Sequence, residues 1–300
     1  MYNGKSVGCV FLNFNSTEEV IQRINAVQEY EVIDHFVVVD NNSSDKTQHK
    51  LLDLASGKVD IILNKVNGGY SAGNNIGINY LRIKYRVDYI CIANPDVIFE
   101  EDCITRLLSV AEQHPKIGIV SCLIETNSDH KPPAAWRLPD YKRCISESML
   151  ICNKLAEKHY LYDCNKPVQK VDVICGAFFI ASNDALFDVN DFDERTFLYY
   201  EENILAFRLK EKGYSNYLVT DCSVYHEVSA SIDKEYNSYI KKAKIMQKSK
   251  SVYYRYYLKI HGLKMFMTRV AFGIGVCEVT IYQVLKKVMN SYKSQGKMNV

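Results

Sequence analysis

The stretch Phe36-Val-Val-Val-Asp40-Asn-Asn-Ser-Ser-Asp45 joins an apolar, mostly β-branched run to an acid and a group of turn-forming residues. The run predicts a buried strand, and the polar residues predict a turn at its carboxyl end. Ligands of open α/β sheets bind at that end of the strands. Asp40 is therefore placed to accept hydrogen bonds from a nucleotide base or ribose, or else to order the turn together with Asp45.

Similar apolar runs alternate with helix-like segments over the first 120 residues. The runs are 7–12, 36–39, 61–63, 89–92 and 117–120, and the helix-like segments span about 17–28, 45–55, 71–84 and 101–113. Such alternation predicts a largely parallel sheet covered by helices. The fold class is therefore α/β, with a Rossmann-like sheet flanked by helices.

Beyond residue 123 the pattern changes. Residues 124–170 hold a proline pair and few strand-like runs, which predicts an irregular insert. A strand at 171–181, a helix at about 202–212 and strand-like runs near 217–219 and 223–226 follow. We expect one domain over 1–233 and a helical, basic, aromatic-rich tail over 234–300.

Composition excludes several classes of protein. The chain has 300 residues, 47% hydrophobic and 24% charged, which excludes a disordered or collagen-like chain. Ten cysteines are scattered without a C-x-x-C pair, so no zinc or redox site is expected. The N-terminus runs into a strand rather than a signal peptide, which favours a reducing cytoplasm.

Charge is concentrated in the tail. Residues 234–300 carry fourteen Lys and Arg against two acids, a net +12, which leaves −10 on residues 1–233. The segment 265–285 is mostly apolar, but its longest charge-free run, 270–277, is shorter than the roughly 18 apolar residues of a spanning helix. A helix lying in a membrane interface fits this pattern, and a helix packed on the rest of the protein is the alternative. Nucleic-acid binding is not expected, because the tail contains no recognisable module and the body is acidic.

Two further segments carry chemistry. Asn67-Gly-Gly-Tyr-Ser-Ala-Gly-Asn-Asn75 places glycines around a helix start, where backbone N–H groups favour an anion. It is not a G-x-G-x-x-G pattern, which disfavours a dehydrogenase. Asn94-Pro-Asp96 ends a strand in an amide and a carboxylate, a donor set that suits Mg²⁺ or Mn²⁺ on a nucleotide diphosphate. Helix capping is the alternative role of Asp96.

In this order and spacing the segments resemble the inverting glycosyltransferases of family 2. The family's D-N-x-S-x-D, N-x-G-x-x-x-G-x-N and N-P-D segments stand at 40–45, 67–75 and 94–96, and its R-x-P stretch is similar to 136–139. Downstream, 176–181, 192–202, 208–214 and 224–231 resemble the rhamnosyltransferase-like branch. The resemblance covers about residues 5–260.

The resemblance implies a GT-A (nucleotide-diphospho-sugar transferase) fold, with a donor half at about 1–123 and an acceptor half at about 124–233. It assigns the nucleotide sugar to Asn13, Asp40, Asn67, Gly69, Asn74, Asn94 and Asp96. It assigns Mg²⁺ or Mn²⁺ to Asp96 and His226, although His226 is alternatively a satisfied histidine at a strand end. It assigns the acceptor to Trp136, Arg137, Asp193 and Glu194, the last two alternatively structural.

The catalytic base departs from the family pattern. The usual E-D-x-D reads Glu201-Glu202-Asn203-Ile204 here. Inversion needs one carboxylate to take the proton of the acceptor hydroxyl, and a glutamate can do this. We assign this role to Glu202, with Glu201 supporting the acceptor site or positioning the base. The alternative is that both glutamates only favour a helix N-terminus.

The resemblance therefore implies a metal-dependent, inverting hexosyltransferase of bacterial surface polysaccharide synthesis, such as that of a capsule. We expect it to move a sugar, with rhamnose favoured, from a nucleotide-diphosphate donor to a polyprenyl-diphosphate-linked saccharide or growing polysaccharide, as a peripheral protein on the cytoplasmic face of the cell membrane. Galactose, galactofuranose or N-acetylglucosamine as the sugar, or a binding subunit without catalysis, are alternatives. The donor, acceptor and linkage stay open, as does homo-oligomerisation through the tail.

Overall fold

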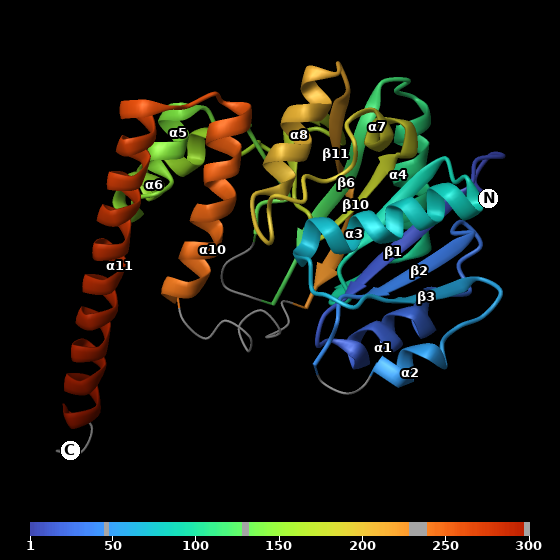
Figure 1. Cartoon of the computed structure of the whole chain (residues 1–300), viewed down its shortest axis with the longest axis horizontal. Coiled ribbons are helices and arrows are strands. Elements are labelled where there is room, and N and C mark those ends of the chain that lie inside the picture. The colour runs from blue at the N-terminus through green and yellow to red at the C-terminus, as the bar shows by residue number, and fades with distance from the viewer. Residues whose placement is uncertain (45–47, 128–131, 228–238, 297–300) are drawn as a thin grey trace. The chain divides into compact units, whose positions relative to one another are not determined.

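The computed structural model describes residues 1–44, 48–127, 132–227 and 239–296 (Figure 1). The chain divides into two compact units, Met1–Leu138 with Tyr162–Val252, and Pro139–Leu161 with Tyr253–Val300. The predicted boundary at 233/234 lies outside the described residues. Residues 139–161, predicted to belong to the first domain, group with the second unit.

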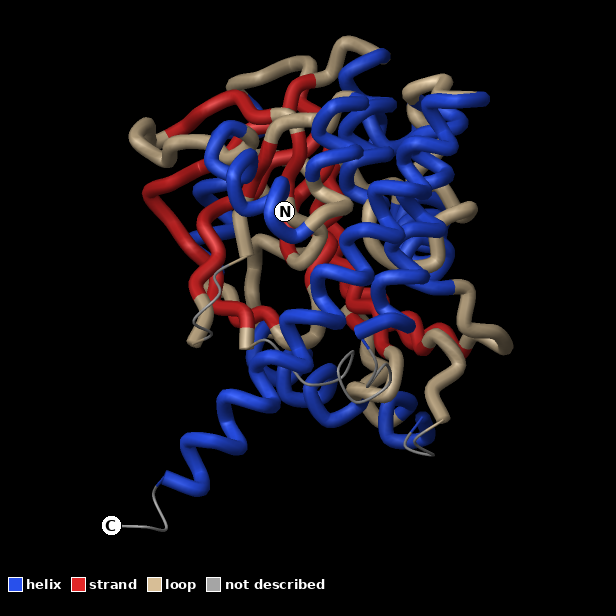
Figure 2. Tube along the Cα trace, turned by 90° about the vertical axis from the view of Figure 1, so that its left-hand side faces the viewer, coloured by secondary structure: helices blue, strands red, loops and turns tan. Residues whose placement is uncertain are grey.

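The first unit is built on a mixed sheet (Figure 1, Figure 2). Its strand order is β3-β2-β1-β4-β10-β6-β11-β5, with β8 beside β11. The bounds are β1 Val7–Asn13, β2 His35–Asp40, β3 Val59–Leu63, β4 Tyr89–Ala93, β5 Val97–Ile98, β6 Ile117–Glu125, β8 Val168–Val171, β10 Phe178–Ser182 and β11 Ser215–His226. Strands β1 to β4 pair in parallel, and β10 is antiparallel to both β4 and β6. A separate pair joins β7 (Ala135–Trp136) to β9 (Val173–Ile174).

Helices cover both faces of this sheet. Their bounds are α1 Thr17–Val27, α2 Gln48–Leu52, α3 Gly69–Tyr80, which continues as the π-helix η1 Leu81–Tyr85, α4 Glu101–Glu112, α7 Asn183–Asp188 and α8 Glu201–Glu211. The first unit also contains the helix α10, Tyr239–Val252. Phe36 and Val38 of β2 belong to the buried apolar cluster that includes α1 and α4, whereas Val37 and Val39 belong to the cluster on the other face, which includes α3, α7 and α8. This alternation of side chains produces two apolar layers. The predicted α/β class and Rossmann-like mixed sheet are confirmed.

Two strand predictions were wrong in detail. The segment 171–181 is divided among β8, β9 and β10. Between β9 and β10, the Gly176 backbone bonds to the Tyr70 and Glu202 side chains instead of continuing a ladder. The runs near 217–219 and 223–226 form the single strand β11, whose register with β6 shifts between Val219 and Ser223. The predicted irregular insert contains the helices α5 (Tyr141–Ser146) and α6 (Leu150–Ala156) and the 3-10 turn η2 (Glu157–His159).

The second unit joins this insert to the C-terminal helices, the π-helix η3 (Tyr253–Tyr257) and α11 (Gly262–Gly296). The Tyr254 hydroxyl donates to the Cys144 carbonyl at 3.3 Å, and the Leu150 N–H donates to the Glu278 carboxylate at 2.5 Å. Gly275 approaches the Ser148 carbonyl so closely that a Cβ would lie 1.9 Å from its oxygen. Part of the tail is therefore a helix packed on the insert.

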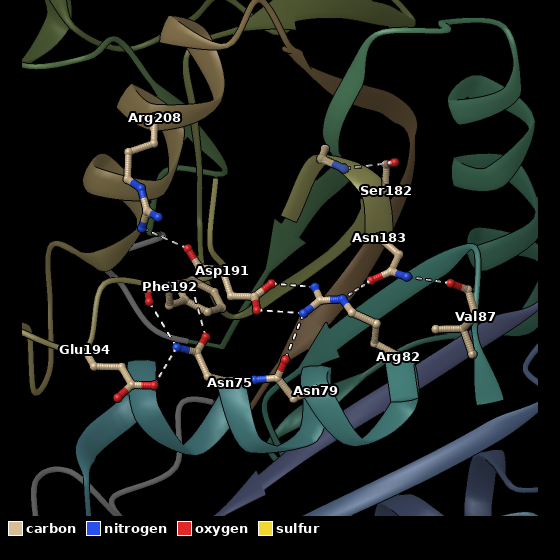
Figure 3. A network of polar contacts seen from close by, with 11 residues as sticks. Asn75, Asn79, Arg82, Val87, Ser182, Asn183, Asp191, Phe192, Glu194 and Arg208 are labelled. Atoms are coloured by element: carbon tan, nitrogen blue, oxygen red, sulfur yellow. Dashed lines mark hydrogen bonds and ion pairs between the residues drawn. The ribbon is translucent and has the colours of Figure 1, made fainter. Parts of the chain in front are cut away.

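One polar network holds α3 in place in the first unit (Figure 3). The Arg82 guanidinium donates to both carboxylate oxygens of Asp191, at 2.6 and 2.8 Å, and to the Asn183 side chain at 2.8 Å. Asn75 on α3 donates to the Phe192 carbonyl, and Arg208 on α8 donates to the Asp191 carbonyl. The segment after α7 is thereby fixed between α3 and α8.

We expect Arg82→Met to destabilise the fold by about 2–4 kcal/mol, because it leaves the Asp191 carboxylate buried without its partner. Arg106→Met is the matched control, since Arg106 makes the same bidentate contact to Asp221 at an exposed position, and it should cost about 1 kcal/mol or less. Urea unfolding of both variants measures the difference. Equal losses would contradict the role given to Arg82.

Candidate active site

The carboxyl ends of β1 and β2 bring Asn13 and Asp40 together. Both are fully buried, and the Asn13 side-chain amide donates to Asp40 at 2.7 Å. Asp40 also accepts from the Ser43 hydroxyl at 2.6 Å, the Ser43 N–H at 3.1 Å and the Gln48 side chain at 2.6 Å. Asp40 therefore orders its turn, as the alternative proposed, and its nucleotide contact stays a prediction. Asp45 lies outside the described residues.

The glycine-rich segment begins α3 and is tied to the same edge of the sheet. The Asn67 side chain accepts from the Gly69 N–H and from the Asn41 amide, each at 2.9 Å. Gly69 has φ +84°, and a Cβ there would lie 2.1 Å from the Phe197 carbonyl oxygen, so only glycine fits. The Asn74 amide donates to Tyr70, and its buried Oδ1 has no partner among the described residues. Asn74 is thus available to a polar ligand.

Pairing of β5 with β11 brings Asp96 and His226 together. His226 lies opposite Val97 in the register, and its Nε2 is 3.1 Å from Asp96 Oδ1. Both side chains are mostly buried, at 14% and 16% exposed, and His226 Nδ1 has no partner among the described residues. Two ligand atoms in adjacent octahedral positions at about 2.1 Å from one ion lie about 3 Å apart, so this pair fits a divalent cation.

The paired glutamates open α8 after an unusual turn. Tyr199 and Tyr200 have φ of +69° and +70°, a left-handed conformation that is rare in tyrosine and is typically held by surrounding structure at functional sites. Glu202 Oε1 accepts from the Gly176 N–H at 3.3 Å. Glu201 is buried, and its Oε2 has no partner among the described residues.

Burial sets the charge of both glutamates. It raises the pKa of Glu201 well above its usual range, and the Glu202 charge raises it further. It also raises the pKa of Glu202, but the N–H groups of Glu202 and Gly176 oppose that rise by stabilising the carboxylate. Glu201 is therefore the member that retains a proton more readily, and Glu202 is the better base.

Gly176 and Ala177 link these parts of the site. The Asn94 N–H donates to the Ala177 carbonyl at 2.8 Å, and the Tyr70 hydroxyl donates to the Gly176 carbonyl at 2.6 Å. Together with the bond to Glu202, they connect the N-P-D segment, the start of α3 and the start of α8. Sequence reasoning missed Tyr70 and the turn at Tyr199 and Tyr200. Burial raises the pKa of the Tyr70 hydroxyl, and the nearby charges of Glu201 and Glu202 raise it further.

The four predicted acceptor residues have different surroundings. The Trp136 indole donates to Asn203 at 2.9 Å, which places it beside the first turn of α8. The Arg137 guanidinium lies over the Tyr162 ring at 4.7 Å. Asp193 pairs with Arg195 at 2.6 Å, and Glu194 accepts from Asn75 at 2.9 Å. Asp193 and Glu194 thus hold the segment before α8, while acceptor binding by all four stays a prediction.

Comparison with known families identifies the chain. Residues 9–186 match the family described as glycosyl transferase family 2. The chain belongs to that family. Among curated family members, it is 27% identical to the rhamnosyltransferase WbbL of Escherichia coli K12 over 65% of this chain and 72% of that protein. It is 26% identical to the N-acetylglucosaminyl-diphospho-decaprenol L-rhamnosyltransferase of Mycobacterium tuberculosis H37Rv, over 51% of each. The predicted rhamnosyltransferase-like family is therefore confirmed.

Solved structures confirm the GT-A fold. The mannosyltransferase PcManGT from Pyrobaculum calidifontis, in complex with GDP-Man and Mn²⁺, has a TM-score of 0.57 at 12% identity, covering 95% of this chain and 79% of its own. GalNAc-T7 with UDP, GalNAc and Mn²⁺ has a TM-score of 0.56 at 14% identity, covering 75% and 44%. Both contain Mn²⁺, so the fold accommodates a divalent metal.

We expect Glu201→Gln to be more stable than the wild type at neutral pH. The pKa of Glu201 is raised in the folded state. Its contribution to the free energy of unfolding is therefore fully present below about pH 4.5 and is lost as pH rises through the folded pKa. Glutamine does not ionise, so the variant avoids this loss, worth about 1.4 kcal/mol for each tenfold change in proton affinity. Thermal unfolding across pH measures the gap.

The control for this substitution is Glu211→Gln, at the exposed far end of α8, which should change stability by less than about 0.5 kcal/mol. A gap between Glu201→Gln and the wild type that is the same at pH 4 and pH 8 would contradict the assignment.

Proposed function

We propose that this chain is an inverting, metal-dependent glycosyltransferase that moves a sugar, with rhamnose favoured, from a nucleotide-diphosphate donor to a hydroxyl of a lipid-linked or growing surface polysaccharide. The observation that supports this proposal most is that three parts of the candidate site bond to the backbone of Gly176 and Ala177. There the base candidate Glu202 is bonded to the same short segment that binds the N-P-D strand end and the start of α3.

The metal site of this proposal is the pair Asp96 and His226. A carboxylate oxygen and an imidazole nitrogen 3.1 Å apart are a donor set that Mg²⁺ or Mn²⁺ accepts. Asp96 and His226 would hold the cation, which would supply positive charge against a nucleoside diphosphate. Asn94 follows the same strand end, where its position suits the diphosphate. Two solved structures of the same fold contain Mn²⁺, which supports this assignment in kind.

Glu202 supplies the proton transfer. Its carboxylate takes the proton of the acceptor hydroxyl, whose oxygen attacks the anomeric carbon while the bond to the diphosphate breaks on the opposite face. One displacement inverts the configuration at that carbon. The Gly176 N–H orients the Glu202 carboxylate, and protonated Glu201 leaves a single negative charge in the pair. Trp136, beside the first turn of α8, is suited to pack on an acceptor sugar.

We expect Glu202→Gln to bind donor and Mn²⁺ like the wild type but to lower kcat by about 10²–10⁴-fold, because it removes the general base. In the wild type, kcat should fall with acid at a pH above 4.5, since burial raises the pKa of Glu202. Thermal shift with donor reports binding, and sugar transfer reports kcat. The control is Glu211→Gln on the same helix. Retained turnover in Glu202→Gln would overturn the role of Glu202.

The same binding measurement identifies the donor. Thermal shifts with dTDP-rhamnose, UDP-galactose, UDP-N-acetylglucosamine and GDP-mannose, each with and without Mn²⁺ or Mg²⁺, compare the candidates. A metal-dependent shift by dTDP-rhamnose supports the proposal. A larger shift by another donor would replace rhamnose, and wild-type donor binding without turnover on any acceptor would favour a binding subunit.

The proposed acceptor and location rest on α11. Six exposed apolar residues follow one another along α11 at spacings of three, four or seven, which places them on one face: Leu263, Met267, Val270, Ile274, Ile281 and Leu285. By length and composition, Gly262–Leu285 is also apolar enough to cross a membrane, with mean hydropathy 1.3. We favour a helix lying in the interface of the cytoplasmic membrane face, where polyprenyl-linked acceptors are found, because basic residues accompany this stripe. The mycobacterial relative is named for an acceptor linked to diphospho-decaprenol, which supports a polyprenyl-linked acceptor here.

We expect Ile274→Glu to weaken binding to anionic liposomes at least tenfold, because a charge replaces an apolar side chain in the middle of the stripe. Ile83→Glu, at an exposed isoleucine of η1, is the matched control and should bind like the wild type. Liposome co-sedimentation measures both. Equal binding by Ile274→Glu would contradict the membrane role, and wild-type binding that resists an alkaline wash would favour a spanning helix.

A further inference from the structure

Three cysteines that are far apart in the sequence converge in the first unit. Cys103 lies on α4, Cys122 on β6 and Cys222 on β11, and their sulfur atoms all lie within 4.8 Å of one another. The Cys103 thiol donates to Cys122 Sγ at 3.6 Å. Cys103 and Cys122 are buried, whereas Cys222 is partly exposed. The sequence-based expectation of no zinc site considered only local spacing, which these residues lack.

The irregularity in β11 delivers the third thiol. Val219 pairs with Cys122 and Ser223 with the next residue of β6, so the residues between Val219 and Ser223 are extra on the β11 side. A bulge of this kind redirects a side chain that regular pairing would place elsewhere. Cys222 thereby contacts both other thiols. Their hydrogen bonds lower the pKa of Cys222, whereas the pKa values of Cys103 and Cys122 are raised, in part by their hydrogen bonds to Cys222.

The spacing of the sulfur atoms matches a metal site. Thiolates bound to one tetrahedral Zn²⁺ at about 2.3 Å lie about 3.8 Å apart. The observed separations of 3.6 to at most 4.8 Å therefore need only small side-chain movements to close on an ion. Asp221 is engaged by Arg106 through both carboxylate oxygens and is not a fourth ligand, but Arg106 supplies positive charge beside the thiols.

We propose that Cys103, Cys122 and Cys222 bind one Zn²⁺ ion as thiolates, with a water from the partly exposed side of Cys222 as the fourth ligand. Binding releases the thiol protons to solvent. The ion joins α4 to β6 and fixes the bulge of β11, four residues before His226. This site is separate from Asp96 and His226, whose oxygen and nitrogen atoms suit a harder cation.

The test uses the full chain, stripped with a chelator and titrated with Zn²⁺ against a chromophoric zinc chelator. We expect one equivalent of Zn²⁺ per chain, and a Zn²⁺-dependent rise in melting temperature. Co²⁺ in place of Zn²⁺ should give the near-ultraviolet absorption of cobalt–thiolate bonds. Cys222→Ser, at a partly exposed position, should lower the Zn²⁺ affinity at least tenfold and abolish the thermal shift.

Cys164→Ser is the matched control, because Cys164 is an exposed cysteine of the same unit and should leave Zn²⁺ binding unchanged. Zn²⁺ binding by Cys222→Ser equal to that of the wild type overturns the proposal. So does a thiol count in denaturant below the ten cysteines of the chain, which would show a disulfide instead. These measurements do not involve sugar transfer, so they test the zinc site independently of the proposed glycosyltransferase activity.

Discussion

The structure of the candidate site depends on the backbone of Gly176 and Ala177. This short segment interrupts the strand-like run 171–181. The Ala177 carbonyl accepts from Asn94 at the end of the β4–β10 ladder, whereas the Gly176 N–H and carbonyl bond to Glu202 on α8 and Tyr70 on α3. A side chain at Gly176 would lie 3.0 Å from Glu202 Oε1, closer than most Cβ contacts allow. Glycine at this position thus lets the proposed base approach the backbone that orients it.

The sequence predicted what local patterns control. Alternating apolar runs located β1 to β4 and β6 to within a few residues, because side chains of period two must fill two apolar layers. It did not predict contacts between distant segments. Asp96 meets His226 only because β11 returns beside β5, and the three thiols at 103, 122 and 222 meet only because β11 carries a bulge. No local spacing encodes either event.

The turn before α8 shows how burial and strain divide the roles of two adjacent acids. Two buried carboxylates beside each other cannot both ionise without a large desolvation and repulsion cost, so the member with fewer hydrogen bonds holds the proton. Glu201 has an unpartnered oxygen, whereas Glu202 accepts from the Gly176 N–H. Tyr199 and Tyr200, both in the left-handed conformation, directly precede the first turn of α8, on which the two acids lie. The family motif identifies the two glutamates, but only their hydrogen bonds in the structure show which of them retains the proton.

The tail shows where a sequence criterion was too narrow. Counting charge-free residues treated Glu278 as an interruption of an apolar segment, but its carboxylate caps the N–H of Leu150 on α6, and Gly275 allows the close helix contact beside it. Glu278 and Gly275 therefore contact the insert, whereas the side chains of the stripe from Leu263 to Leu285 are exposed. Because one side of α11 packs on the insert, we propose the exposed apolar stripe as the side that contacts lipid, which is the arrangement of an interfacial helix rather than of one surrounded by lipid.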